Sequence, residues 1–262
     1  MNIPKHVLFD VAFSAVTQRQ AVHHIVSWLK APADVPHLVV TPNVHFAVMQ
    51  RKNPDFRRLL NSASLCVVDG RPILWASRWL GVPLPEVVTG SDLVPAILAA
   101  CANKPDNAPL KVFLLGAAPG VAAKAAERIE QQYPGVEVSG HYSPPFGFEL
   151  NEAECTDICR RVRDSGAELL VLGLGAPKQE FWAQRHLLAT GVKVAVCAGA
   201  TIDFMAGVKP RAPQWMQQAG LEWLFRVFSE PRRLAKRYIN DGLALPRLLW
   251  AEYWKLRRIR QQ

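Results

Sequence analysis

Short apolar segments rich in β-branched residues alternate with segments of helical period from the start of the chain to about Gly207. Strands that are apolar on every side are buried on both faces, and helices inserted between consecutive strands make those strands parallel. The alternation predicts an α/β fold, with a parallel sheet covered by helices on both faces and a ligand at the carboxyl ends of its strands. The expected strands are His37–Thr41, Ser64–Val68, Lys111–Leu115, Glu137–His141, Leu169–Gly173 and Val192–Cys197.

The pattern changes after Gly207, where the apolar strands stop and only helical segments follow. We therefore expect an α/β body over residues 1–207 and an all-helical appendage over residues 208–262. The expected helices of the body are Thr17–Lys30, His45–Asn61, Ser91–Cys101, Gly120–Tyr133, Asn151–Ser165 and Lys178–Thr190. Those of the appendage are Pro213–Phe228, Pro231–Asp241 and Pro246–Arg260, separated at Pro231, Gly242 and Pro246.

The appendage is strongly basic. From Arg211 to the end, the chain has eleven Lys and Arg residues against four Asp and Glu, and four of its eight tryptophans. This combination favours a polyanionic partner, which is nucleic acid, a phosphate-bearing substrate or an anionic membrane surface. Because the cations alternate with Trp, Leu and Glu, and no known nucleic-acid-binding motif is present, we expect no nucleic acid partner.

The last expected helix has two apolar sides. Trp250, Trp254 and Leu243 form one of them, bordered by arginines, which is typical of a helix that lies on a membrane surface. Packing of these tryptophans against a neighbouring element is the alternative, and the sequence leaves both open. The opposite side is expected to pack on the body; it carries Leu245, Leu248, Leu249, Tyr253, Leu256 and Ile259.

The chain offers no segment that is long and apolar enough to span a bilayer, and its first residues lack the pattern of a secretory signal. Its five cysteines include no Cys-x-x-Cys pair, which indicates reduced, buried thiols rather than disulfides or a metal site. We expect a cytoplasmic protein that can lie on a membrane.

Two connections of the type strand, glycine turn and helix are candidate phosphate sites. After Gly173, the turn at Gly175 leads to a helix opened by Pro177, whose free N–H groups suit a phosphate or diphosphate, with Lys178 and Gln179 beside them. The second connection, from Gly116 to Gly120, lacks the Gly-x-Gly-x-x-Gly spacing, and the chain has no Walker motif. The sequence therefore gives little support to an NAD(P) enzyme.

Polar residues follow two further strands. Thr41 and Asn43 come after the first, and Asp69 comes after the next, so all three are expected at the carboxyl edge of the sheet. Asp69 is either a general base or the N-cap of the following helix, and nothing local decides between these roles.

Longer motifs carry a resemblance. Gly173–Glu180, Gly199–Gly207, Arg211–Trp215, Gly220–Arg226 and Glu230–Tyr238 together resemble the WecG/TagA/CpsF family of bacterial glycosyltransferases (glycosyltransferase family 26). Thr41–Asn43, Asp69–Gly70 and Gly90–Leu93 match the amino-terminal motifs of that family in the right order. The resemblance covers roughly residues 39–238.

The resemblance implies an inverting transferase that moves a sugar from a UDP-sugar to a polyprenyl-diphosphate-linked sugar at the inner face of the cell membrane. It also implies a Rossmann-like body whose helical appendage helps to complete the site and contacts the membrane.

The resemblance further implies a role for individual residues. Asp69 would deprotonate the acceptor hydroxyl group, and Thr41 and Asn43 would orient the sugar or acceptor. The other residues would bind substrate: the glycine loop would face the donor, Asp203 would lie beside the nucleotide-sugar, and Arg226 and Arg233 would approach the diphosphate. These residues are Gly173, Gly175, Lys178, Gln179, Glu180, Asp203, Arg211, Arg226 and Arg233.

The charge that develops on the departing diphosphate requires a metal ion or fixed positive groups. Because the chain has no Asp-x-Asp, we expect metal-independent transfer without a cofactor, with helix N–H groups and arginines in this role. Val87 occupies a position where members of the family usually carry arginine, and Arg71 and Arg78 are the candidates to replace it.

The donor sugar is expected from a finer resemblance. Asp69–Trp75 and Gly81–Pro85 resemble the exopolysaccharide members of the family, including the xanthan-type glucosyltransferase, which favours UDP-glucose and a β-1,4 link. The alternatives are N-acetylmannosamine or its uronic acid as the donor sugar, or a non-catalytic protein that binds a membrane or nucleic acid.

Overall fold

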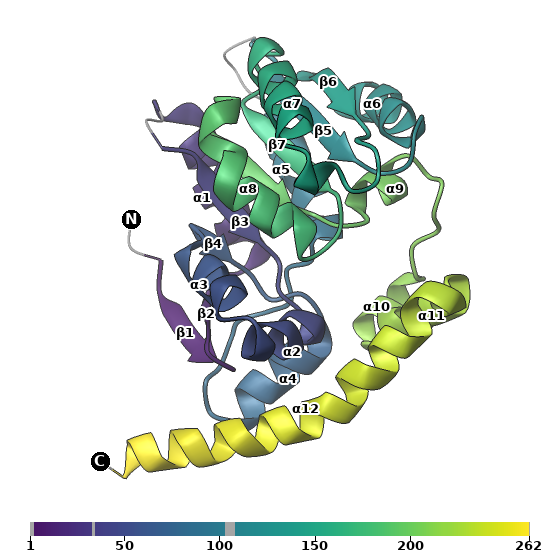
Figure 1. Cartoon of the computed structure of the whole chain (residues 1–262). Helices are drawn as coiled ribbons and strands as arrows, with labels where there is room; N and C mark the ends of the chain where they lie inside the picture. Colours follow the sequence, from purple (N-terminus) through teal and green to yellow (C-terminus); the bar gives the residue numbers. More distant parts are fainter. Residues whose placement is uncertain (1–2, 33–34, 103–107, 262) are drawn as a thin grey trace.

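The computed structural model describes residues 3–32, 35–102 and 108–261, and it contains the predicted parallel sheet. Its strands are β3 (His37–Val40), β4 (Leu65–Cys66), β5 (Leu110–Gly116), β6 (Val136–Tyr142), β7 (Leu169–Gly173) and β8 (Val194–Cys197). They lie side by side in the order β4-β3-β8-β7-β5-β6, and every neighbouring pair is parallel. All six carboxyl ends therefore point to one edge of the sheet (Figure 1).

Helices cover both faces of this sheet, as predicted, because successive residues of the central strands alternate between two hydrophobic cores. In β7, Leu170 and Leu172 belong to one core, whereas Leu169 and Val171 belong to the other. The first core is completed by α2 (Val44–Lys52), α3 (Pro54–Ser62), α4 (Arg71–Trp79), α7 (Glu152–Asp164) and α8 (Lys178–Thr190). The second is completed by α1 (Gln18–Lys30), α5 (Gly90–Ala102), α6 (Val121–Gln132) and α9 (Thr201–Met205).

Three parts of the body differ from the sequence-based expectation. The expected helix His45–Asn61 is two helices, because Asn53 caps a new helix whose first residue is Pro54. Helix α9 and a short 3-10 turn, η1 (Phe148–Leu150), were not predicted, and α4 was expected only as a helix after Asp69, without bounds. An antiparallel hairpin, β1 (Lys5–Leu8) and β2 (Val11–Ser14), precedes α1 and was not predicted either.

The appendage consists of α10 (Gln214–Gln218), α11 (Glu222–Ser229) and α12 (Pro231–Arg260). The expected helix Pro213–Phe228 divides near Gly220, whose φ is +75°. The two expected helices after Pro231 are instead one helix of 30 residues, with Gly242 and Pro246 inside it. An interior proline costs about 3 kcal/mol. Packing offsets this cost, because Leu248 is buried in the core and Leu249 and Leu256 pack against it.

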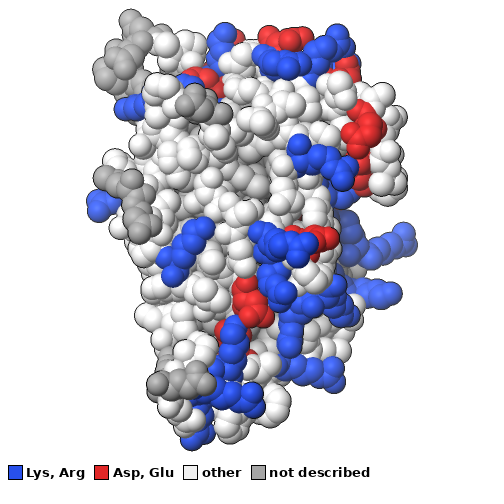
Figure 2. Space-filling model, turned by 60° about the vertical axis from the view of Figure 1, so that its left-hand side comes forward, with Lys and Arg blue, Asp and Glu red and all other residues white. Residues whose placement is uncertain are grey.

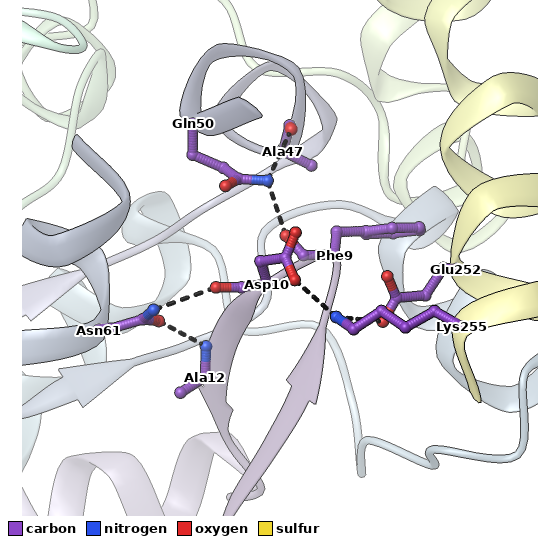
Figure 3. Close-up of polar contacts among 8 residues, drawn as sticks. All are labelled: Phe9, Asp10, Ala12, Ala47, Gln50, Asn61, Glu252 and Lys255. Atoms are coloured by element: carbon purple, nitrogen blue, oxygen red, sulfur yellow. Dashed lines mark hydrogen bonds and ion pairs between the residues drawn. The ribbon is translucent and has the colours of Figure 1, made fainter. Parts of the chain in front are cut away.

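Helix α12 begins next to α11 and runs along the body to the amino-terminal hairpin (Figure 1). At the hairpin turn, Lys255 Nζ lies 2.5 Å from Asp10 Oδ1, and the neighbouring Glu252 is almost completely buried (Figure 3). The same turn is bound by α2, because Gln50 Nε2 donates to the carbonyl oxygen of Phe9 at 2.7 Å. The hairpin therefore joins the carboxyl half of α12 to the body.

All five cysteines lie in the described ranges and are buried, as expected, and none of them forms a disulfide. Within the described ranges, no helix combines the length and apolarity that crossing a membrane requires.

Candidate active site

A cavity of about 240 Å³ lies at the carboxyl edge of the sheet, below the appendage. The loops after β3, β4, β7 and β8 supply one side of it, and α11 and α12 supply the other. Its polar lining is dominated by groups of both charges and by exposed backbone. The residues concerned are Thr41, Asn43, His45, Asp69, Thr89, Gly90, Ser91, Gly173, Gly175, Gln179, Asp203, Lys209, Glu222, Arg226, Arg233 and Arg237.

A second, larger cavity of about 520 Å³ adjoins the first. The two share a set of lining residues, which are Asn43, His45, Asp69, Thr89, Glu222, Arg226 and Arg237. Apolar side chains of Trp223, Tyr238 and Leu245 line the larger cavity only. We call the first the basic cavity and the second the outer cavity, and Asp69 lies at their boundary.

Asp69 lies three residues after the end of β4 and is partly buried. Burial raises the pKa of its carboxyl group to about 6, although the positive charge of Arg226 opposes the shift. The N-cap of α4 is Gly70, without a side-chain cap, so Asp69 does not cap this helix. Its carboxylate instead accepts a hydrogen bond from Asn43 Nδ2 at 3.4 Å. A carboxylate with this pKa can take up a proton from a substrate near neutral pH.

Asn43 and Thr41 are positioned by the start of α2 and by β8. Asn43 Oδ1 accepts from the N–H of His45 at 3.0 Å and thereby caps α2, which leaves its amide nitrogen for Asp69. Thr41 donates its hydroxyl hydrogen to the carbonyl oxygen of Cys197 at 3.3 Å. Both side chains line the basic cavity beside Asp69.

The glycine turn after β7 also faces the basic cavity. The first helical turn of α8 holds this loop in place, because Gln179 Oε1 accepts from the N–H of Gly175 at 3.3 Å. Gly175 has a φ of +83°, in the region that favours glycine. A Cβ at Gly173 would lie 2.8 Å from Ile202 Cδ1 and 3.1 Å from the carbonyl oxygen of Gly199, so a larger residue there would require Ile202 of α9 to shift.

Basic side chains from the appendage reach the same cavity. Lys209 pairs with Asp203 at 3.1 Å and with Glu230 at 3.3 Å, and Glu230 in turn binds Arg233 at 2.6 Å. This chain of ion pairs joins α9 to the start of α12. Arg237 is a stronger candidate for an anion, since its Nε is buried and has no hydrogen-bond partner among the described residues.

Three of the residues expected to bind substrate lie elsewhere. Lys178 points towards the segment before α7, where it pairs with Glu149 at 3.5 Å. Glu180 is fully buried behind the loop and accepts from Gln179 Nε2 at 2.7 Å. Arg211 lines neither cavity, and its 2.6 Å ion pair with Asp92 ties the appendage to α5. Their positions do not support direct contact with a substrate.

Val87 lines the outer cavity. Of the two candidates to replace an arginine at this position, Arg71 lines the same cavity, whereas Arg78 does not. In the other candidate phosphate turn, Gly116 serves packing, because a Cβ there would lie 2.5 Å from the backbone of Gly173, whereas a Cβ on Gly120 would meet no atom within 4 Å. Gly116 and Gly120 line neither cavity.

The site expected from the sequence did not include His45, Thr89, Lys209, Glu222 or Arg237, all of which line the basic cavity. His45 carried a signal, since it is two residues beyond Asn43 at the start of a helix. The appendage residues carried none, because their positions depend on how α11 and α12 fold over the sheet. Across the described ranges, no three His, Cys, Asp or Glu side chains gather in a way that could hold a metal ion.

Comparison with known proteins adds a family and named relatives. Residues 6–261 match the model of the Glycosyl transferase WecG/TagA/CpsF family. A Bacillus spizizenii protein named N-acetylglucosaminyldiphosphoundecaprenol N-acetyl-beta-D-mannosaminyltransferase is 30% identical over 75% of this chain and 72% of its own length. Proteins of the same name from Staphylococcus aureus strains MRSA252 and MW2 are each 26% identical over 90% of this chain and 89% of theirs.

Proposed function

We propose a function for this chain from the premise that it belongs to the WecG/TagA/CpsF family of glycosyltransferases. The chain transfers a hexosyl group from a UDP-sugar to a polyprenyl-diphosphate-linked sugar, with inversion of the anomeric centre. The observation that carries this proposal is the position of Asp69, a carboxyl group of raised pKa at the boundary between a basic cavity and an outer cavity.

The donor sugar that we propose is N-acetylmannosamine. The relatives are named for N-acetylmannosaminyl transfer to an N-acetylglucosaminyl diphospholipid, which favours the alternative considered from the sequence. Glucose, the first expectation, has no support in those names.

In this proposal the basic cavity holds the donor. Its diphosphate lies against the glycine turn and the start of α8, within reach of Arg226 and Arg237. Free N–H groups and guanidinium groups stabilise the negative charge that appears on UDP as its bond to the anomeric carbon breaks. Asp69 takes the proton from the acceptor hydroxyl group, whose oxygen forms the new bond to that carbon from the opposite face.

The first test measures UDP release by the purified chain with N-acetylglucosaminyl- and glucosyl-diphospholipid acceptors. UDP-N-acetylmannosamine, its uronic acid, UDP-N-acetylglucosamine and UDP-glucose are supplied separately, each with and without excess EDTA. We expect acceptor-dependent release from UDP-N-acetylmannosamine that EDTA does not reduce. Release from UDP-glucose alone would support glucose as the donor sugar instead. Loss of release in EDTA would contradict metal independence. Absence of UDP release from every donor and acceptor pair, with and without EDTA, would contradict the transferase function.

The membrane surface is the proposed location of the acceptor lipid, and the carboxyl half of α12 is the proposed contact. Trp250 is 68% exposed and Trp254 41% exposed, and the Arg257 guanidinium lies 5.4 Å from the ring centre of Trp254. On α4, Trp79 is also exposed and stacks with Tyr253. On the face that it presents, Figure 2 shows Lys and Arg outnumbering Asp and Glu over the lower part of the molecule.

Replacing both Trp250 and Trp254 by serine is expected to lower binding to vesicles that contain anionic lipid by at least about 10-fold, since an interfacial tryptophan supplies both apolar area and headgroup contact. Vesicle flotation measures the bound fraction. Leu188→Ser is the control, because Leu188 is 72% exposed, similar to Trp250, but lies on α8. An unchanged bound fraction in the double variant would remove this surface from the proposal.

A further inference from the structure

His45 lies at the point where the two cavities meet. It is the second residue of α2, and its backbone N–H donates to the Asn43 side chain that also contacts Asp69. The imidazole is partly exposed and lines both cavities. The start of α2 therefore places His45 in the same turn of the chain as Asn43, which contacts Asp69 directly.

A buried carboxylate on α12 holds the ring of His45. Asp241 is 5% exposed, and its Oδ1 lies 3.0 Å from His45 Nδ1. A carboxylate oxygen only accepts, so Nδ1 carries a hydrogen, and in the tautomer that this hydrogen bond selects the lone pair is on Nε2. In the part of the chain that the structure describes, Nε2 has no hydrogen-bond partner. It is therefore the ring nitrogen that is left for a ligand.

The surroundings favour the acceptor as that ligand. Asp241 lines the outer cavity but not the basic cavity, so the pair is anchored on the outer side of the boundary. The outer cavity has more than twice the volume of the basic cavity, and it carries the aromatic side chains of Trp223 and Tyr238, against which the apolar face of a sugar ring can pack. A hydroxyl group that gives its proton to Asp69 must belong to a sugar at this boundary.

From this placement we infer that His45 is an acceptor-binding residue, and that Asp241 is the positioning residue that orients its ring. The Nε2 nitrogen accepts a hydrogen bond from a hydroxyl group of the acceptor sugar next to the one that Asp69 deprotonates. The inference rests on the proposed transferase function and deepens it, since it places the acceptor in the outer cavity. It also makes acceptor binding depend on both the body and the appendage.

Two substitutions separate this role from a purely structural link between α2 and α12. In His45→Asn, the side-chain amide can take the place of Nδ1 and still donate to Asp241, but nothing replaces Nε2. We expect the KM for the diphospholipid acceptor to rise about 10-fold, as one lost hydrogen bond of about 1.4 kcal/mol would produce. The KM for the UDP-sugar, the Kd for UDP and the Tm should stay at their wild-type values.

In His45→Gln, the longer side chain brings a carboxamide to the position of Nε2, and we expect it to recover most of the acceptor affinity. His186→Asn is the matched control, because this histidine is on α8 and lines neither cavity. An unchanged acceptor KM in His45→Asn would overturn this inference and leave the proposed function standing. So would a lower Tm with equal increases of both KM values, which a mere link between helices predicts. Absence of transfer by the wild-type chain would overturn the proposed function, and this inference with it.

Discussion

Asp69→Asn is expected to lower the turnover number by about 10²- to 10⁴-fold, the usual contribution of a general base. The amide has the shape of the carboxyl group but cannot take up the acceptor proton. Because Asp69 does not cap α4, the substitution should leave the fold intact. Single-turnover rates with saturating donor and acceptor measure the chemical step, and the Kd for UDP shows whether the donor site survives. A turnover number within threefold of wild type would exclude Asp69 as the base.

The pH dependence of the same reaction gives an independent check. The pKa of Asp69 is raised to about 6, so the group is neutral and inactive as a base below that pH and ionised above it. We expect kcat/KM to rise with pH through a midpoint near 6. Because the charge of Arg226 lowers the pKa of Asp69, Arg226→Gln should move this midpoint to higher pH, in addition to weakening donor binding. The residual kcat/KM of Asp69→Asn should not show this rise with pH.

The largest expected effect on stability concerns Glu180. Its carboxyl group is fully buried, which raises its pKa to about 7 from an ordinary value of 4.5, although Gln179 donates a hydrogen bond to it. Between these two pH values the folded chain holds a proton that the unfolded chain releases. The free energy of unfolding contributed by this group therefore falls as pH rises, by about 1.4 kcal/mol per pH unit and about 3 kcal/mol in all, and the loss is complete above pH 7.

Glu180→Gln removes this titration while keeping an oxygen that can accept from Gln179. As pH rises from 4.5 to 8, the wild type should lose about 3 kcal/mol of its free energy of unfolding that the variant keeps. Chemical denaturation of both proteins at several pH values measures this difference. Glu152→Gln is the control, since Glu152 is exposed and its replacement should change nothing in this range. Parallel pH profiles for wild type and Glu180→Gln would contradict the prediction.

The sheet was predictable because its central strands, β7 and β8, are apolar on both faces, a pattern typical of a parallel sheet covered by helices. The hairpin before α1 was not predictable: its turn places Phe9 and Asp10 at φ values of +53° and +61°, and a bulky residue such as Phe9 rarely adopts such a value. Contacts with α2, α3 and α12 determine that turn, and they lie far away in the sequence. The continuity of α12 was hidden for a similar reason, since local preference at Pro246 opposes a helix that packing of Leu248 supports.

Within the site, the residues on the carboxyl edge of the sheet could be predicted because parallel strands place them there. Thr41, Asn43, Asp69 and Gly173 follow directly from that rule. Which side of α8 faces the cavity could not be predicted, so Gln179 was grouped with Lys178 and Glu180 although only Gln179 lines it. The arrangement of Lys209, Arg233 and Arg237 depends on the fold of the appendage, to which the strand pattern does not apply.

The continuity of α12 has a consequence for how far the acceptor must extend. One uninterrupted helix carries both Arg237, at the cavities, and Trp250, on the surface proposed to meet the membrane. At about 1.5 Å per residue, the two positions are held about 20 Å apart along the helix axis. If Trp250 lies among the lipid headgroups, the reacting carboxylate is kept at a constant height above the bilayer. The acceptor is then selected partly by length, because only a diphosphate-linked sugar that reaches that height can be glycosylated while its lipid stays in the bilayer.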